Sequence, residues 1–285
     1  MSVTGGFKAA GAEAAPPWPR WLGVNLARGA AAIARPPRPM PKRGARFYLR
    51  TAAAALAAVL LIVAVMVYAD AAVAEAARRS PRWVLVAFAF VTDFGKSGWF
   101  LWPTGVLLVA IAALASPALA PVHRLLLAAV AVRLGFLFVA IAAPGLFVTV
   151  VKRLIGRARP FVGGHADPFL YLQFVWRPDY ASMPSGHATT AFAAAVAFGL
   201  LWPRLRLPML AYALVIAVSR VVLDAHYVSD VLAGAIVGAV GALIVRDWFA
   251  ARRLGFTIGA AGGVHALPGP SWARIKRVAR RRIAP

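Results

Sequence analysis

The stretch between the last two apolar segments of the chain reads SRVVLDAHYVSD, residues 219–230. His226 and Asp230 are four positions apart, and positions i and i+4 of a helix lie on one face. Asp230 is therefore expected to accept a hydrogen bond from one imidazole nitrogen, which leaves the other nitrogen neutral and nucleophilic. Arg220 comes six residues before His226, and its guanidinium can hold two phosphate oxygens at once. The stretch therefore predicts a site for a reactive anion.

A second stretch, PSGH at residues 184–187, opens another apolar run. If that run is a helix, the backbone amides of Ser185 and Gly186 lie at its positive end, where anions bind. His187 would stand beside the bound anion. The stretch predicts a second part of the same site.

A third stretch, KRLIGRARP at residues 152–160, closes an earlier apolar run. Lys152 and Arg159 are seven positions apart, which is about two helical turns or roughly 10 Å. Both cations could reach one anion from the same side if the helix continues that far. Pro160 limits how far it can continue.

The three stretches together resemble the type-2 phosphatidic-acid phosphatase superfamily. They read Lys152-x6-Arg159-Pro160, Pro184-Ser185-Gly186-His187 and Ser219-Arg220-x5-His226-x3-Asp230. Every position of the family pattern holds the expected residue, in the expected order, and the resemblance covers about residues 51–250.

The resemblance implies a phosphoryl transfer in which His226 attacks phosphorus and becomes a phosphohistidine. Asp230 would orient His226, and His187 would protonate the leaving group. The phosphate oxygens would be held by Lys152, Arg159, Ser185, Gly186 and Arg220. No cofactor is implied. A metal site made of the two histidines and the carboxylate is disfavoured, because three cations aimed at one spot repel a metal ion.

The composition is that of a protein embedded in a membrane. Of its 285 residues, 61% are hydrophobic and 14% are charged, far from the balance of soluble domains. A formal net charge of +23 would also suit a nucleic-acid partner. The basic residues gather in the tails and beside the apolar runs, where anionic lipid headgroups explain them, so no nucleic-acid partner is expected.

Hydropathy predicts an all-α polytopic membrane protein with a bundle of six transmembrane helices, since a crossing takes roughly 20 apolar residues. The predicted spans are residues 51–68, 101–118, 125–150, 187–202, 207–223 and 229–249. The predicted divisions are a disordered basic tail (1–46), the membrane phosphatase domain (47–250) and a second basic tail (251–285). Residues 161–183 are expected to form a loop over the entrance of the site.

Three features have two interpretations each. Residues 83–99 form either a re-entrant or interfacial segment beside the site, or a plain loop. Arg133, inside a predicted span, either partners an anion or extends to the membrane edge. Gly234, Gly238 and Ala242, spaced by four, would allow close packing within the bundle or in a homodimer.

The basic residues before position 51 predict a cytoplasmic N-terminus. Six spans then place both termini in the cytoplasm and the three stretches at the opposite face. We therefore expect a multi-pass protein of a bacterial cytoplasmic (inner) membrane with a periplasmic site.

The expected function is metal-independent hydrolysis of a phosphate monoester or diphosphate on a membrane lipid. Phosphatidic acid, phosphatidylglycerophosphate, an isoprenoid diphosphate and a lipid A phosphate all fit the sequence. The alternative is a non-catalytic transporter of phospholipids or lipid anions. A transporter would need the cations and helix ends, but not a His226–Asp230 pair facing a second histidine.

Overall fold

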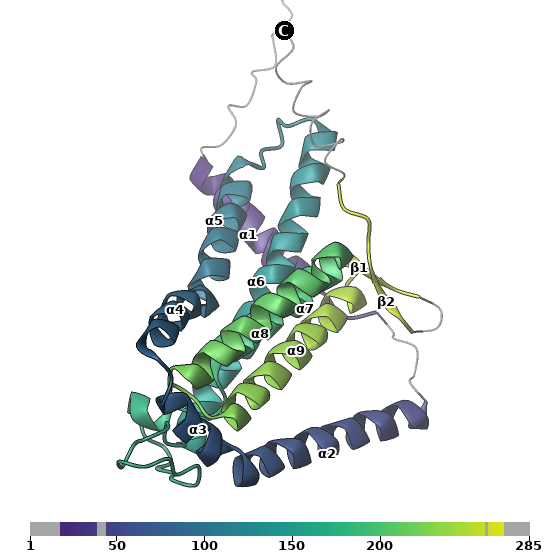
Figure 1. Ribbon diagram of the computed structural model, residues 1–285. Coiled ribbons are helices and arrows are strands. Elements are labelled where there is room, and N and C mark those ends of the chain that lie inside the picture. Colours follow the sequence, from purple (N-terminus) through teal and green to yellow (C-terminus); the bar gives the residue numbers. More distant parts are fainter. Residues whose placement is uncertain (1–17, 39–43, 260–261, 271–285) are drawn as a thin grey trace, which may run out of the picture.

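The computed structural model describes residues 18–38, 44–259 and 262–270. Its elements, coloured along the chain in Figure 1, are α1 (Trp18–Ala34), α2 (Ala45–Tyr68), α3 (Asp70–Arg78), α4 (Arg82–Thr92), the 3-10 turn η1 (Asp93–Gly95), α5 (Gly98–Leu114), α6 (Pro121–Ile155), η2 (Pro178–Tyr180), α7 (Gly186–Leu201), η3 (Pro203–Leu205), α8 (Arg206–Val222), α9 (Val228–Ala251), β1 (Phe256–Ile258) and β2 (Val264–Ala266). The prediction of an all-α membrane protein is confirmed, apart from one short hairpin.

The protein is a multi-pass membrane protein. Five helical segments of the described chain are long and apolar enough to cross a bilayer: α2, residues 82–114 (α4 through α5), α6, residues 203–222 (η3 and α8), and α9. The predicted spans correspond to these five and to α7. With 16 residues, α7 is apolar but shorter than the other five. The described chain therefore has five helical segments long enough to cross a bilayer, where six spans were predicted.

The short helix α7 is the centre of the bundle. It packs against α6, α8 and α9, and in Figure 1 it lies between them. Its alanines are buried along nearly its whole length. A side chain at Gly234 or Gly238 of α9 would collide with the backbone of Ser185 or Thr189 of α7. The stripe of small residues in α9 therefore serves helix packing within the bundle.

Different segments of the chain meet at the two ends of the helical bundle. At one end, the amide of Ser185 at the start of α7 donates to the carbonyl of Asp230 in the first turn of α9 (3.0 Å). At the other end, the amide of Arg38 donates to the carbonyl of Ala251 (3.0 Å), which closes α9. Arg38 and the end of α9 therefore lie together, opposite the three motif stretches.

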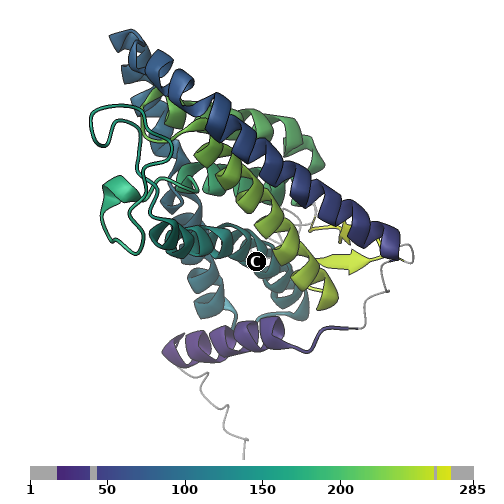
Figure 2. The same ribbon diagram turned by 90° about the horizontal axis from the view of Figure 1, so that it is seen from below.

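The prediction of a disordered tail over residues 1–46 is wrong for residues 18–34, which form α1. The stretch has no sustained apolar periodicity, but it is rich in alanine and leucine, which favour helix. Tertiary contacts fix it beside α5 (Figures 1 and 2). The side-chain amide of Asn25 donates to the carbonyls of Ala112 and Ala115, each at 2.9 Å, and so satisfies carbonyls that the end of α5 leaves unpaired.

The predicted C-terminal tail also begins with regular structure. The strands β1 and β2 pair antiparallel, and Phe256 of β1 is buried edge-on against Phe136 of α6, with ring centroids 4.7 Å apart. Arg133 donates to the carbonyls of Ala129 (2.7 Å) and Leu267 (2.8 Å), so it holds the segment after the hairpin. Residues 1–17, 39–43, 260–261 and 271–285 of the two predicted tails lie outside the described residues.

Candidate active site

The helix that carries Lys152 ends sooner than the motif spacing allows. Gly156 caps α6 in the left-handed conformation (φ 64°), and its amide donates to the carbonyl of Lys152 (3.1 Å). A side chain at position 156 would collide with the backbone of Leu172, so glycine is required there. The helix therefore does not continue to Arg159, which was the condition for placing both cations on one helical face. Lys152 lies in the last turn, and Arg159 follows in the loop.

The second stretch begins α7 as predicted, but one of its amides is already engaged. Ser185 is the N-cap of α7 and Gly186 is its first residue. The sequence suggests that the Ser185 amide is free to bind an anion. Instead, this amide donates to the carbonyl of Asp230. The Ser185 hydroxyl is buried and has no partner within the described chain. The Nζ of Lys152 comes within 3.9 Å of where a Cβ on Gly186 would lie.

His226 lies in the turn between α8 and α9 rather than in a helix. Its amide donates to the carbonyl of Arg220 (3.2 Å). Asp230 is in the first turn of α9, where its Oδ2 accepts the amide of Tyr227 (2.9 Å) and completes a capping box. The turn positions His226 and Asp230 together, although not through the i, i+4 helical geometry that the spacing predicts.

A serine that the sequence did not single out stands between the two. His226 Nδ1 is 3.7 Å from Asp230 Oδ2, which is too long for a hydrogen bond. The hydroxyl of Ser182 donates to Asp230 Oδ2 (2.5 Å) and lies 3.4 Å from His226 Nδ1. Nδ1 is thus turned toward Ser182 and Asp230, which leaves Nε2 as the free nitrogen. Burial lowers the pKa of His226, although Asp230 opposes the shift, so the imidazole is neutral at pH 7.

His187, in the first turn of α7, is the second histidine of the site. The turn η1 packs on its ring, since a Cβ at Gly95 would come within 2.9 Å of His187 Cδ2. The ionisable groups that act electrostatically on His187 are Arg220, His226, Lys96 and Lys152. This places the turn between α4 and α5 beside the site. Residues 83–99 are nonetheless part of a segment, residues 82–114, that is long and apolar enough to cross a bilayer, which is neither the re-entrant or interfacial segment nor the plain loop expected.

Arg220 reaches the same place from α8. Its Nη1 donates to the hydroxyl of Thr92 at the end of α4 (2.7 Å). Its Nε is buried without a partner in the described chain, and so is the Nε of Arg159. Both guanidinium groups lie within electrostatic range of each other and of His226. Unpaired buried donors are costly, and an anion between these groups would pair them.

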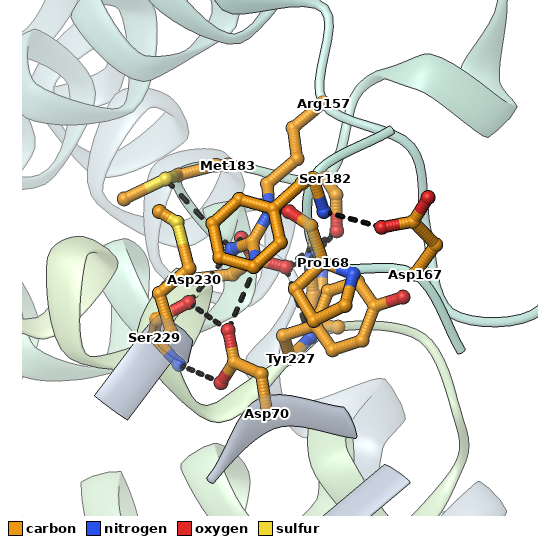
Figure 3. A network of polar contacts seen from close by, with 12 residues as sticks. Asp70, Arg157, Asp167, Pro168, Ser182, Met183, Tyr227, Ser229 and Asp230 are labelled. Carbon is orange, nitrogen blue, oxygen red and sulfur yellow. Dashed lines mark hydrogen bonds and ion pairs between the residues drawn. The ribbon is translucent and has the colours of Figure 1, made fainter. Parts of the chain in front are cut away.

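The same end of the bundle holds a buried arginine that the sequence analysis did not assign to the site. Arg157 has no exposed surface and donates to Asp230 Oδ1 (2.6 Å) and Asp70 Oδ2 (2.8 Å), as Figure 3 shows. Burial disfavours its charge, but these two carboxylates raise the pKa of Arg157 above its ordinary value. Within its stretch, Arg157 looks like one more basic residue. Asp70 is distant in sequence and has no local signal.

The described residues contain no group of three or more histidine, cysteine or acidic side chains that could hold a metal ion. What they bring together is a neutral histidine backed by a carboxylate, a second histidine, and three cations: Lys152, Arg159 and Arg220. This arrangement can bind a tetrahedral anion and supply a nucleophile to it.

Part of the chain is similar to known proteins. Residues 133–254 match the family model described as the PAP2 superfamily. This segment, which is less than half of the chain, is similar to the PAP2 superfamily. The resemblance carried by the three stretches is therefore confirmed, and the matched PAP2 segment includes every predicted site residue from Lys152 to Asp230.

Two groups of curated proteins are similar to the chain. A lipid A 1-phosphatase of Rhizobium johnstonii is 38% identical over 128 residues, which cover 45% of this chain and 52% of that protein. A decaprenylphosphoryl-5-phosphoribose phosphatase of Mycobacterium tuberculosis is 37% identical over 114 residues, 36% of this chain and 58% of that protein. The chain thus matches little more than half the length of these relatives.

Two solved structures are also similar. One is the PAP2-type phosphatidylglycerolphosphate phosphatase of Bacillus subtilis, with a TM-score of 0.48 and 20% identity over 68% of this chain and 92% of that chain. The other is LpxE of Aquifex aeolicus, with a TM-score of 0.44 and 18% identity over 62% of this chain and 93% of that chain.

Proposed function

We propose that this protein is a phosphatase that hydrolyses a phosphate monoester or diphosphate on a membrane lipid, without a metal ion. The observation that carries the proposal is a buried imidazole whose Nδ1 faces Ser182 and Asp230. It is set among cations, and the buried Nε atoms of Arg159 and Arg220 have no partner in the described chain. A transporter of lipid anions would use the cations, but it has no use for an oriented, neutral imidazole. Phosphoryl transfer needs both.

We infer a role for each residue of the site. Lys152, Arg159 and Arg220 would bind the phosphate oxygens, together with the hydroxyl of Ser185 and the start of α7 at Gly186. These groups neutralise the charge of the phosphate, which otherwise repels a nucleophile.

The reaction would proceed in two steps. Nε2 of His226 attacks phosphorus, the N–P bond forms, and the P–O bond to the lipid breaks while His187 gives its proton to the departing oxygen. Water then attacks the phosphohistidine and gives a proton back to His187. The N–P bond breaks, and inorganic phosphate leaves. Asp230, through Ser182, stabilises the positive charge that His226 acquires during attack.

A lipid substrate is supported by two features. The site lies at one end of a bundle of membrane helices, where a headgroup can enter from the bilayer surface. The similar proteins are named as phosphatases of lipid A and of decaprenylphosphoryl-5-phosphoribose. Phosphatidic acid, phosphatidylglycerophosphate, isoprenoid diphosphates, lipid A phosphates and decaprenyl-linked sugar phosphates form the panel to be tested.

The first prediction is that phosphate release does not depend on a metal ion. The purified protein in detergent should release phosphate from at least one lipid of the panel at the same rate with and without EDTA, because cations of the chain neutralise the phosphate. Inorganic phosphate is measured, and a magnesium-dependent phosphatase is assayed in parallel as a control for chelation. Loss of turnover in EDTA that magnesium or zinc restores would refute the proposal.

The second prediction concerns location. We propose that both termini are cytoplasmic and that the site faces the periplasm of a bacterial inner membrane. In support of this, Arg38, which precedes α2, lies at the end of α9, opposite the site. A reporter protein that works only in the cytoplasm should be active when it is fused after Pro285, and one that works only in the periplasm should be inactive there. A cysteine placed in the loop at residues 163–167 should react with a membrane-impermeant reagent in intact spheroplasts. The reverse labelling pattern would place the site in the cytoplasm.

A further inference from the structure

The guanidinium of Arg157 is fully buried, where a charge is unfavourable unless it is paired, and several hydrogen bonds hold it. Its Nε donates to the carbonyl of Pro168 (2.9 Å), and Nη1 donates to the hydroxyl of Ser229 (2.7 Å) as well as to Asp230. Its plane lies over the ring of Tyr227, 4.6 Å from the centroid. One guanidinium thus joins the loop after α6, the turn before α9 and the first turn of α9 (Figure 3).

These contacts divide the two oxygens of Asp230 between two sets of donors. Oδ1 accepts from Arg157 (2.6 Å), while Oδ2 accepts from Ser182 (2.5 Å) and from the amide of Tyr227 (2.9 Å). A carboxylate held at both oxygens cannot rotate about its last bond. The oxygen that faces Ser182 and His226 is therefore fixed by what Arg157 does to the other oxygen.

Arg157 is in turn fixed from a different part of the chain. Asp70, the first residue of α3, is buried and takes Nη2 of Arg157 on its Oδ2. It also accepts the amide of Ser229 on Oδ1 (2.9 Å) and the hydroxyl of Ser229 on Oδ2. The position at the start of α9 favours a negative charge. Asp70 lies outside the segment that matches the PAP2 model, residues 133–254.

We propose that Arg157 is a positioning residue that holds the carboxylate of Asp230 in register with His226, and that Asp70 holds Arg157 in place. Arg157 touches neither the phosphate nor the reacting atoms, so it acts through Asp230. The N-terminal part of the chain thereby contributes to the site through α3. This inference rests on the proposed phosphatase function and adds two residues to its machinery.

The test uses the full-length protein and the lipid that the wild type hydrolyses fastest. Arg157→Lys keeps one positive charge but replaces the planar guanidinium with a single ammonium, which cannot serve two carboxylates and Pro168 together. We expect kcat to fall on the order of 10²-fold, as small displacements of catalytic groups do, with KM changed by less than about threefold because the phosphate-binding cations remain. Asp70→Asn should reduce kcat by roughly tenfold, because Asp230 keeps its own contact with Arg157.

A pair of variants separates positioning from mere stability. Arg157→Met leaves two buried carboxylates without their partner and should lower the melting temperature strongly. Adding Asp70→Asn to Arg157→Met removes one of those charges, so part of the melting temperature should return. The value of kcat should stay as low as in Arg157→Met, because Asp230 still lacks its donor.

The matched control is an exposed pair on the same loop. Arg177 and Asp179 are 3.4 Å apart with most of their side chains in solvent, so Arg177→Met and Asp179→Asn should change neither kcat nor melting temperature. If Arg157→Lys keeps a kcat near that of an active wild type, or if kcat recovers with melting temperature in the double variant, the inference is wrong. A wild type that releases no phosphate from any lipid would overturn the proposed function, and this inference with it.

Discussion

His226→Ala is expected to lower phosphate release on the order of 10⁴-fold or more, as removing the nucleophile of a covalent mechanism does. Binding of the lipid phosphate should persist, because Lys152, Arg159 and Arg220 still neutralise it. Both quantities are measured on the same protein preparation: inorganic phosphate by colour assay, and lipid binding by the shift in melting temperature with lipid concentration. The wild type should also form an acid-labile phosphoenzyme that the variant does not form.

The control is His165→Ala, because His165 is an exposed loop residue that the mechanism does not use. It should retain full activity, which excludes a general effect of losing a histidine. Near-normal phosphate release by His226→Ala would show that another group attacks phosphorus. A wild type that binds these lipids but releases no phosphate from any of them would instead establish the transporter alternative.

The membrane helices were predictable because hydropathy depends on short stretches of sequence. The approximate spans agree with α2, α5, α6, α7, α8 and α9 within a few residues at most ends. The grouping of the three stretches at one end follows from the alternation of helix direction alone. No long-range contact had to be known for either prediction.

The details of the site were not predictable in the same way, because they depend on where the helices end. The left-handed Gly156 stops α6 before Arg159, and the turn at residues 223–227 puts His226 outside α9. Both replace a regular helical spacing with a turn. A spacing argument assumes that the helix continues, so the local geometry that it predicted differs from the structure.

Contacts between distant segments account for the other differences. Ser182 reaches the His226–Asp230 pair from the loop before α7, and Asp70 reaches Arg157 across 87 positions of sequence. Helix α1 is fixed by hydrogen bonds from Asn25 to the end of α5. None of these partners is marked by the sequence around it. A buried arginine between two carboxylates becomes visible only when α3 and α9 are placed together.

Asp230→Asn is the second change with a large expected effect. Asparagine keeps the shape but not the charge, so the carboxamide no longer offsets the positive charge that His226 acquires when Nε2 attacks phosphorus. Its NH2 group must also face either Arg157 or Ser182, where an acceptor is needed. We expect kcat to fall roughly 10²- to 10⁴-fold, as when a hydrolase loses the carboxylate behind its histidine. Phosphate release is measured under saturating lipid.

The protein should still fold, because Arg157 keeps Asp70 as a charged partner. Asp224→Asn is the matched control: it removes a carboxylate two residues before His226, at a left-handed position (φ 51°) that asparagine tolerates. That variant should stay within about threefold of wild-type kcat, since Asp224 has no contact with the imidazole. Equal losses in the two variants would mean that any nearby negative charge suffices. A fully active Asp230→Asn would show that His226 needs no carboxylate behind it.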